Sequence, residues 1–146
     1  MSMVDITAKP EVYREATAVG RIKLRPETIK LIREGLIEKG DPIYTAKIAG
    51  ILAAKNTPAL IPLCHPIPIT NVDIDIIIID ESTIEVSATV RSRAQTGVEM
   101  EALVAASIAL LTIWDMVKKY EKNSEGQYPY TLIQEIRVIR KVKEKG

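Results

Sequence analysis

Residues 72–91 of the chain read VDIDIIIIDESTIEVSATVR, and this stretch decides the fold. Apolar residues stand at every second position from 72 to 78 and again from 84 to 90, mostly with polar residues between them. Alternation with period two is typical of a half-buried β-strand. The DEST segment at 80–83 consists of turn-forming and polar residues. The stretch therefore predicts a β-hairpin with one apolar face and one more polar face.

The segments on either side of this hairpin supply the remaining elements. A strand is expected at about 15–24, and a helix begins at Pro26, since proline suits a first helical turn; Gly40 is expected to end it. Asp41 and Pro42 begin a second helix that closes at about 56–58. Prolines in 58–68 exclude a regular helix or a central strand there. A long helix follows Gly97 to about residue 122, and a last strand is expected at 136–142.

The predicted order is strand, helix, helix, strand, strand, helix, strand. Apart from the additional helix, this is the βαββαβ pattern of a ferredoxin-like sandwich, an α+β fold with an antiparallel sheet. We expect a single domain over residues 1–146, with the helices on one face of the sheet. The other face would need cover, which favours self-association.

Composition narrows the functional classes. The 146 residues carry 20 basic and 19 acidic side chains, a formal charge of +1, so a general nucleic-acid binder is not expected. One cysteine and one histidine can form neither an internal disulfide nor a Cys/His zinc site.

The N-terminus lacks an apolar signal region, and the longest apolar run, around 76–79, is too short to span a bilayer. We expect a cytoplasmic protein, and the many Ile, Lys and Glu residues hint at a thermophilic source.

The only histidine and the only cysteine stand together in the segment LIPLCHP at 60–66. Prolines on both sides hold the backbone extended, so Cys64 and His65 can be presented with little ordering cost. From the residues alone two interpretations stay open. His65 is either a surface histidine without a task or a catalytic group whose partners come from elsewhere in the chain.

Charged residues on the long helix form two further candidates. Glu99 and Glu101 open the helix, where carboxylates ordinarily complement the helix dipole. Asp115 and Lys118 are three residues apart on one face, and the simplest interpretation is an exposed ion pair. Fourteen residues of helix span about 21 Å. Either the glutamates lie on the loop before the helix, or Glu101 and Asp115 serve a site that two subunits share.

Two basic residues outside this helix are also candidates. Lys39 precedes Gly40 at the junction of the two early helices. It is either a dipole complement at a helix C-terminus or a phosphate contact. Arg14 is either solvated or a second contact for an anion.

Together these segments resemble the MoaC family, the cyclic pyranopterin monophosphate synthases. The resemblance spans nearly the whole chain, in the order and spacing of the family. Its motifs are MVD at 3–5, REA at 14–16, KGD at 39–41, TAKIAG at 45–50, IPLCHP at 61–66, TGVEMEAL at 96–103 and TIWDMVK at 112–118.

The resemblance implies a ferredoxin-like homohexamer, a trimer of dimers with the active site at the dimer interface. The implied reaction converts 3′,8-cyclo-7,8-dihydro-GTP to cyclic pyranopterin monophosphate and releases pyrophosphate, in molybdenum cofactor biosynthesis. No metal or organic cofactor is implied. The family's catalytic residues correspond to Asp115, Lys118 and Lys39. The family's pterin-binding residues correspond to Leu63, Cys64, His65, Met100 and Glu101. We add Glu99 and Arg14 to the expected substrate-binding group.

One departure and two alternatives remain. Family members often end in a glycine-interrupted lysine tail, whereas this chain ends in KVKEKG, so Lys141 and Lys145 match only weakly. A non-catalytic ferredoxin-like module that binds nucleotides or pterins would need the loop and the interface but not the pair of Asp115 and Lys118. An RNA-binding module stacks bases on sheet aromatics, and the predicted hairpin has none.

Overall fold

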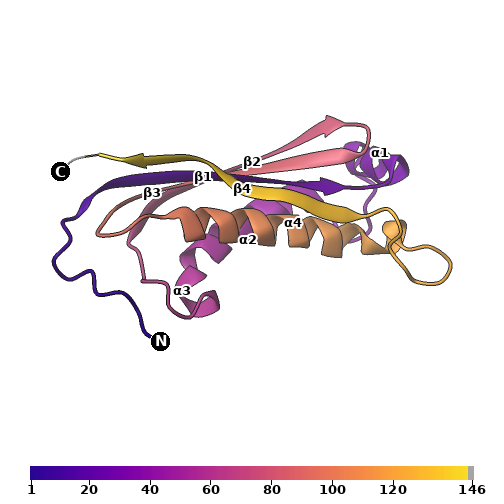
Figure 1. Cartoon of the computed structure of the whole chain (residues 1–146). Coiled ribbons are helices and arrows are strands. Elements are labelled where there is room, and N and C mark those ends of the chain that lie inside the picture. The colour runs from indigo at the N-terminus through magenta and orange to yellow at the C-terminus, as the bar shows by residue number, and fades with distance from the viewer. Residues whose placement is uncertain (145–146) are drawn as a thin grey trace.

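The computed structural model describes residues 1–144. Four strands, β1 (Val12–Lys23), β2 (Ile69–Asp80), β3 (Thr83–Ala94) and β4 (Leu132–Lys143), form one antiparallel sheet in the order β2-β3-β1-β4. Helices α2 (Pro42–Lys55) and α4 (Glu99–Glu121) cover one face of this sheet (Figure 1). The α+β fold with a ferredoxin-like strand order is therefore confirmed.

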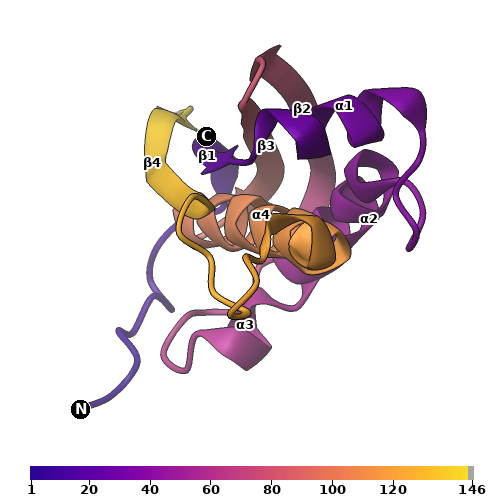
Figure 2. The ribbon, with the colours of Figure 1, turned by 90° about the vertical axis from the view of Figure 1, so that its right-hand side faces the viewer.

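Small residues allow α4 to lie close to the sheet and to α2. The buried face of α4 carries four alanines, followed by Leu110, Ile113 and Val117. A Cβ atom on Gly20 of β1 would lie 2.6 Å from Leu110 Cδ1, so only glycine leaves room for this leucine. Viewed from one end, α4 and α2 lie side by side against the sheet (Figure 2). This close packing fixes both ends of α4 relative to the strands.

The hairpin expected from residues 72–91 is present, with its apolar residues facing the helices. Ile84, Val86, Ala88 and Val90 of β3 are fully buried. The alternation predicted both strands because residues two apart in a strand face the same side.

Several element boundaries differ from the expectation. Helix α1 (Pro26–Glu34) ends at Gly35, whose φ of 70° is a left-handed cap, and not at Gly40. A one-turn helix, α3 (Thr57–Leu60), lies at the start of the proline-rich segment, with Pro58 in its first turn, a position that proline tolerates. Strand β4 begins at Leu132, earlier than expected, and its pairing with β1 is interrupted by irregularities.

By length and composition α4 is long and apolar enough to cross a membrane, so the expectation based on residues 76–79 was too narrow. That expectation considered only uninterrupted apolar runs. In the fold, half of the apolar window of α4 is buried against its neighbours. The apolar character of α4 is therefore that of a core helix.

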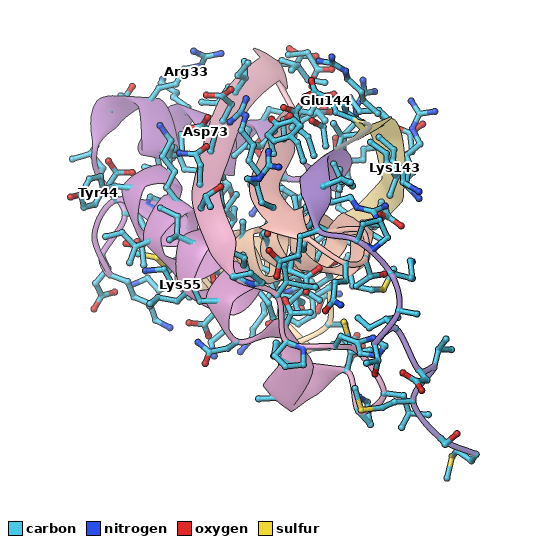
Figure 3. All side chains as sticks on the ribbon, turned by 90° about the vertical axis from the view of Figure 1, so that its left-hand side faces the viewer. Arg33, Tyr44, Lys55, Asp73, Lys143 and Glu144 are labelled. Carbon is cyan, nitrogen blue, oxygen red and sulfur yellow. The ribbon has the colours of Figure 1, made fainter. Side chains whose placement is uncertain are left out.

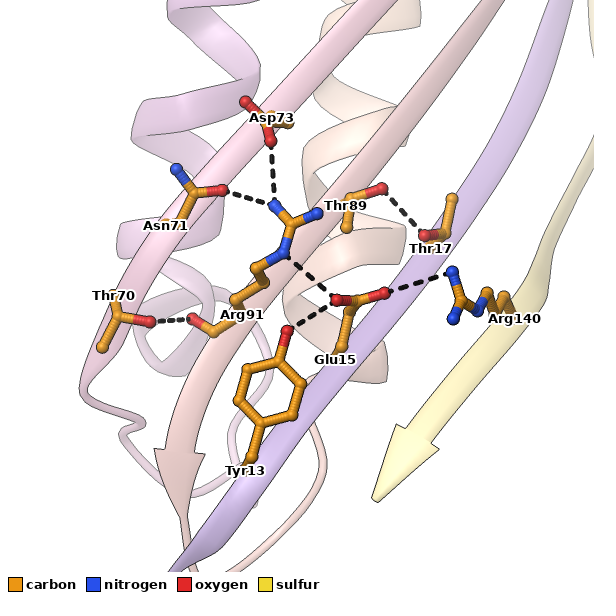
Figure 4. Close-up of polar contacts among 9 residues, drawn as sticks. All are labelled: Tyr13, Glu15, Thr17, Thr70, Asn71, Asp73, Thr89, Arg91 and Arg140. Carbon is orange, nitrogen blue, oxygen red and sulfur yellow. Dashed lines mark hydrogen bonds and ion pairs between the residues drawn. The ribbon is translucent and has the colours of Figure 1, made fainter. Parts of the chain in front are cut away.

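The uncovered face of the sheet is polar along its two central strands. Glu15 of β1 accepts hydrogen bonds from Tyr13 at 2.6 Å and Arg91 at 3.1 Å and lies 3.6 Å from Arg140 (Figure 4). The hydrogen bond from Tyr13 is the largest cause of the lowered pKa of Glu15. Arg91 also bonds to Asp73 at 2.8 Å. The central polar groups of this face are therefore satisfied within one copy, whereas Ile77 and Ile79 of β2 stay exposed. The expected self-association stays a prediction.

Candidate active site

Three predicted residues meet at the C-terminal end of α4. Lys118 Nζ lies 3.1 Å from Asp115 Oδ1, and Lys39 Nζ lies 3.2 Å from Asp115 Oδ2. Lys39 also donates to the backbone carbonyl of Asp115 at 3.2 Å. Hydrogen bonds from Lys118 and then Lys39 lower the pKa of Asp115. Two cations therefore share one ionised carboxylate, which leaves a net positive charge for an anion.

A network that the sequence did not reveal holds Lys39 against α4. The backbone N–H of Glu38 donates to the hydroxyl oxygen of Tyr120 at 2.9 Å, and Lys119 pairs with the Glu38 carboxylate. Both partners follow Lys118 directly in the chain. The loop that carries Lys39 is thus tied to the same helical turn that carries Lys118.

Glu121 fixes the end of this turn from the inside. Its carboxylate is 1% exposed and accepts hydrogen bonds from the backbone N–H of Arg25 and from the hydroxyl groups of Thr28 and Thr131. It thereby joins α4 to the start of α1 and to the segment before β4. One signal in the sequence could have found it, because Glu121 stands four residues after the buried Val117, at a core position of the helix.

A cavity of about 420 Å³ opens beside the three residues. The cavity is lined by Lys39, Asp115 and Lys118 together with Glu38, Met116, Lys119 and Tyr120. The side chains of Lys39 and Lys118 are 47% and 44% exposed. The burial that would tune a lysine for proton transfer is therefore not found in one copy of the chain.

A different environment lies at the N-terminal end of α4. Glu101 is 1% exposed, and one of its carboxylate oxygens, Oε1, is buried without a hydrogen-bond partner. Burial is the largest cause of its raised pKa. The Cys64 thiol lies 3.8 Å from Glu101 Oε2, and burial followed by the charge of Glu101 raises the pKa of Cys64. Burial therefore favours the protonated form of both groups, which is the form that can donate a proton.

His65 and Arg14 flank this end of the helix. His65 Nε2 lies 2.7 Å from the carbonyl oxygen of Val4. Arg14 is 4% exposed and donates to the carbonyls of Ala94 at 3.4 Å and Gln95 at 3.3 Å, at the turn between β3 and α4. Arg14 is therefore buried, not solvated, and its guanidinium is held against the turn that precedes α4.

Lys141 also reaches this end. Its ammonium group lies 3.4 Å from Glu99 Oε2, and it belongs to the ordered strand β4. Lys145, the second tail lysine that matched weakly, lies outside the described residues.

Leu63 and Met100 are 44% and 40% exposed and add apolar surface to this end. Next to them a shallow, mostly apolar groove runs along α4. Its lining residues are Leu60, Ile61, Met100, Leu103, Val104, Ser107 and Ile108.

The two groups of residues do not meet within one copy of the chain. Glu99 and Glu101 lie in the first turn of α4, which excludes the alternative that they belong to the preceding loop. Asp115 lies fourteen residues further along the same helix, at about 21 Å. Within one copy, therefore, the two groups are too far apart to contact one small ligand together.

Within residues 1–144, no group of three or more His, Cys, Asp and Glu side chains is placed to hold a metal ion. The two ends of α4 present two ammonium groups with a carboxylate at one end, and a buried carboxyl with a thiol and an imidazole at the other.

Known proteins resemble the chain over nearly its full length. The sequence model of the MoaC family matches residues 3–145. A relative from Pyrococcus furiosus is 61% identical over 144 residues, which cover 99% of this chain and 92% of the relative. A relative from Saccharolobus solfataricus is 62% identical over 98% of this chain and 95% of its own length. Each of these two is named a probable cyclic pyranopterin monophosphate synthase.

Proposed function

This chain belongs to the MoaC family, and from that premise and the geometry of α4 we propose that it is a cyclic pyranopterin monophosphate synthase. The proposed substrate is 3′,8-cyclo-7,8-dihydro-GTP, and the products are cyclic pyranopterin monophosphate and pyrophosphate. The enzyme would thus be a phosphorus–oxygen lyase of molybdenum cofactor biosynthesis. It would act in the cytoplasm on a small molecule, without a nucleic-acid or membrane partner.

The observation that carries this proposal is the convergence of Lys39 and Lys118 on Asp115. Lys39 is 76 residues away from Asp115 in the chain, yet its ammonium group bonds to both the side chain and the backbone of that residue. An ordinary surface pair would not need a second lysine and a loop tied down by Tyr120. Two ammonium groups held this way suit a triphosphate and the departing pyrophosphate.

The two ends of α4 suit different parts of the reaction. Closing a cyclic phosphate requires a hydroxyl oxygen to attack phosphorus while pyrophosphate leaves with the electrons of the broken bond. Lys39 and Lys118 would stabilise that leaving group, and ionised Asp115 would hold them in place. Glu101, whose pKa is raised by burial, is placed to move protons on the purine-derived ring, with Cys64 and His65 beside it.

A two-fold axis near the middle of α4 would bring the two ends together. Ile108 stands midway between Glu101 and Asp115. If two copies of α4 pack antiparallel across Ile108, Glu101 of each copy faces Asp115 of the other. Exposed apolar side chains on the helical face support such a contact, with Tyr44 projecting outward from α2 (Figure 3). These side chains include Tyr44, Ile48, Leu52, Met100 and Leu111.

This contact would form the dimer of the proposed hexamer, a trimer of dimers. The measurement is light scattering under native conditions. A mass six times that of one chain is expected. A stable monomer would contradict both the assembly and the shared site.

A non-catalytic module that binds a nucleotide or a pterin is the second candidate. The residues around Glu101 would suffice for such a module. The two lysines paired with Asp115 would have no task in it, because binding alone does not need them. Pyrophosphate release from 3′,8-cyclo-7,8-dihydro-GTP decides between the two. The proposed synthase releases one pyrophosphate for each product formed, whereas a binding module protects the substrate without releasing any.

A further inference from the structure

The first eleven residues form a segment without helix or strand that leads into the start of β1 and passes the loop after α3 (Figure 1). Its contact with that loop is the hydrogen bond between the carbonyl oxygen of Val4 and His65 Nε2, at 2.7 Å. Nearly all of these residues are exposed, so burial does not explain why the segment lies there. Specific polar contacts must hold it.

Gln95 supplies most of these contacts. Its side-chain nitrogen lies 3.2 Å from the carbonyl oxygen of Ile6, 3.3 Å from that of Thr7 and 3.0 Å from that of Lys9. Since all three partners can only accept, the amide nitrogen and not the amide oxygen must face them. The backbone carbonyl of Gln95 also accepts from Arg14. Gln95 therefore joins the segment to the turn that precedes Glu99 and Glu101.

A local turn stiffens the segment between Gln95 and His65. The Asp5 carboxylate accepts from the backbone N–H of Thr7 at 2.9 Å and from its hydroxyl group at 2.6 Å. The N–H of Lys9 donates to the carbonyl of Ile6 at 2.9 Å. With these bonds in place, the position of the Val4 carbonyl follows from that of Gln95.

The Val4 carbonyl determines which imidazole nitrogen carries the proton. A carbonyl oxygen accepts hydrogen bonds and cannot donate one, so a neutral His65 must keep its proton on Nε2. Nδ1 then carries the free lone pair, and it has no hydrogen-bond partner among the described residues.

We propose that residues 3–9 act as a strap that holds His65 as the Nε2–H tautomer and leaves Nδ1 as its proton acceptor, with Gln95 as the positioning residue of the strap. The reaction that Nδ1 would serve rests on the proposed function, whereas the tautomer and the strap do not.

The tautomer is directly measurable because His65 is the only histidine of the chain. Protein with ¹⁵N-labelled imidazole is examined by NMR at pH 8.5, where an ordinary imidazole is neutral, without substrate. In the expected spectrum, Nε2 has the ¹⁵N chemical shift of a protonated imidazole nitrogen and Nδ1 has that of an unprotonated one. A proton on Nδ1, or a rapidly exchanging mixture of tautomers, would overturn the proposal.

Two variants test the strap itself. Gln95→Ala removes its anchor, and deletion of residues 2–8 removes the Val4 carbonyl without touching the core. In both, the two ¹⁵N shifts should move toward the averaged values of a tautomer mixture. The kcat for pyrophosphate release should fall by up to about 10²-fold, the scale expected when a catalytic group is misplaced. Gln134→Ala, on exposed β4, is the matched control and should change neither quantity.

The possible outcomes separate the strap from the proposed function. Imidazole spectra that are unaltered in both variants would overturn the strap. Altered spectra with unchanged kcat would overturn its role in positioning His65 for the reaction. If the unaltered protein releases no pyrophosphate, the proposed function fails, and the spectra still decide the strap.

Discussion

The two ends of α4 present charged groups in opposite ways. At the C-terminal end, Asp115 is exposed, paired with two lysines and held with a lowered pKa. At the N-terminal end, Glu101 is buried, has an unpartnered oxygen and a raised pKa, and lies beside the Cys64 thiol. One carboxyl therefore stays ionised to organise cations, while the other is prepared to exchange a proton.

The difference shows that burial can outweigh the position in a helix. A helix N-terminus favours a negative charge, so the dipole alone would lower the pKa of Glu101. Removal of the carboxyl from water acts in the opposite direction and is the larger effect. At the other end, Lys118 complements the helix C-terminus and pairs with Asp115 in solvent, where burial is the smallest influence on the pKa of Asp115.

The largest effect is expected at the exposed end. Lys118→Ala and Asp115→Asn should each lower the rate of pyrophosphate release by several decades, whereas the double variant should be little worse than the worse single variant, because the residues act as a unit. Stability should change little, since the pair is exposed. The measurements are a double-mutant cycle on turnover and substrate affinity by calorimetry.

The control for this cycle is the exposed pair of Lys30 and Glu34 on α1, at 4.0 Å. Lys30→Ala should leave turnover intact. A near-normal rate in Lys118→Ala would contradict a catalytic role, and lost affinity with normal chemistry at saturation would make Lys118 a phosphate anchor.

Glu101→Gln tests the buried end and should lower the rate by about 10²–10⁴-fold, the usual contribution of a general acid or base. The same substitution should also change how the stability of the protein depends on pH. Because the pKa of Glu101 is raised in the folded state, its contribution to stability is full below the unfolded pKa and is lost as the pH rises through the folded pKa. The native protein should therefore lose stability as the pH rises above about 4.5, and the variant should lose less.

Urea unfolding at pH 5 and pH 8 measures how the free energy of unfolding changes with pH in the two proteins. Glu125→Gln is the control, since Glu125 is exposed. Identical pH dependence in the native protein and in Glu101→Gln would show that the buried carboxyl is not shifted.

Tyr120→Phe should have a smaller effect. It removes the oxygen that accepts from the N–H of Glu38, so Lys39 is held less firmly against Asp115. We expect turnover to fall several-fold and stability to fall by about 1 kcal/mol or less. Tyr130→Phe is the matched control, since Tyr130 lines a different cavity, beside Arg25 and Pro26. Equal turnover in the two variants would show that the loop positions Lys39 without help from Tyr120.

The smallest effect concerns the reactivity of Cys64. Since burial and then Glu101 raise the pKa of its thiol, alkylation by iodoacetamide at pH 8 should be slower than that of a free cysteine peptide. Glu101→Gln should speed it up by removing the neighbouring charge. Mass spectrometry follows the reaction cleanly, because Cys64 is the only cysteine. A native rate equal to that of the peptide would contradict the burial of this end.

The sequence predicted the elements better than their ends. Alternation at 72–90 predicted the hairpin because period two has a single structural meaning, whereas Gly35 and Gly40 are both plausible helix ends and only the backbone shows which one is used. Helix α3 was missed because a single turn at Pro58 leaves no periodic pattern.

For the site, residue types and spacing identified Asp115 and Lys118 as a pair and Lys39 as a candidate phosphate contact. The resemblance to the family added the catalytic role of all three. Neither source could reveal that Lys39 pairs with Asp115, because that contact depends on how the loop after α1 packs. The sequence also gave Glu101 the ordinary dipole role of a first-turn carboxylate. Its burial follows from tertiary packing, which no local pattern records.

The most direct test of the shared site is complementation between Glu101→Gln and Lys118→Ala. In a mixed dimer one site carries both changes and the other carries none. When the two variants are unfolded, mixed in equal amounts and refolded together, about a quarter of the native pyrophosphate release should return, since half of the dimers are mixed and half of their sites are intact. If the activity is no higher than that of the separately refolded variants, Glu101 and Lys118 of different copies do not form one site. That result would contradict the account.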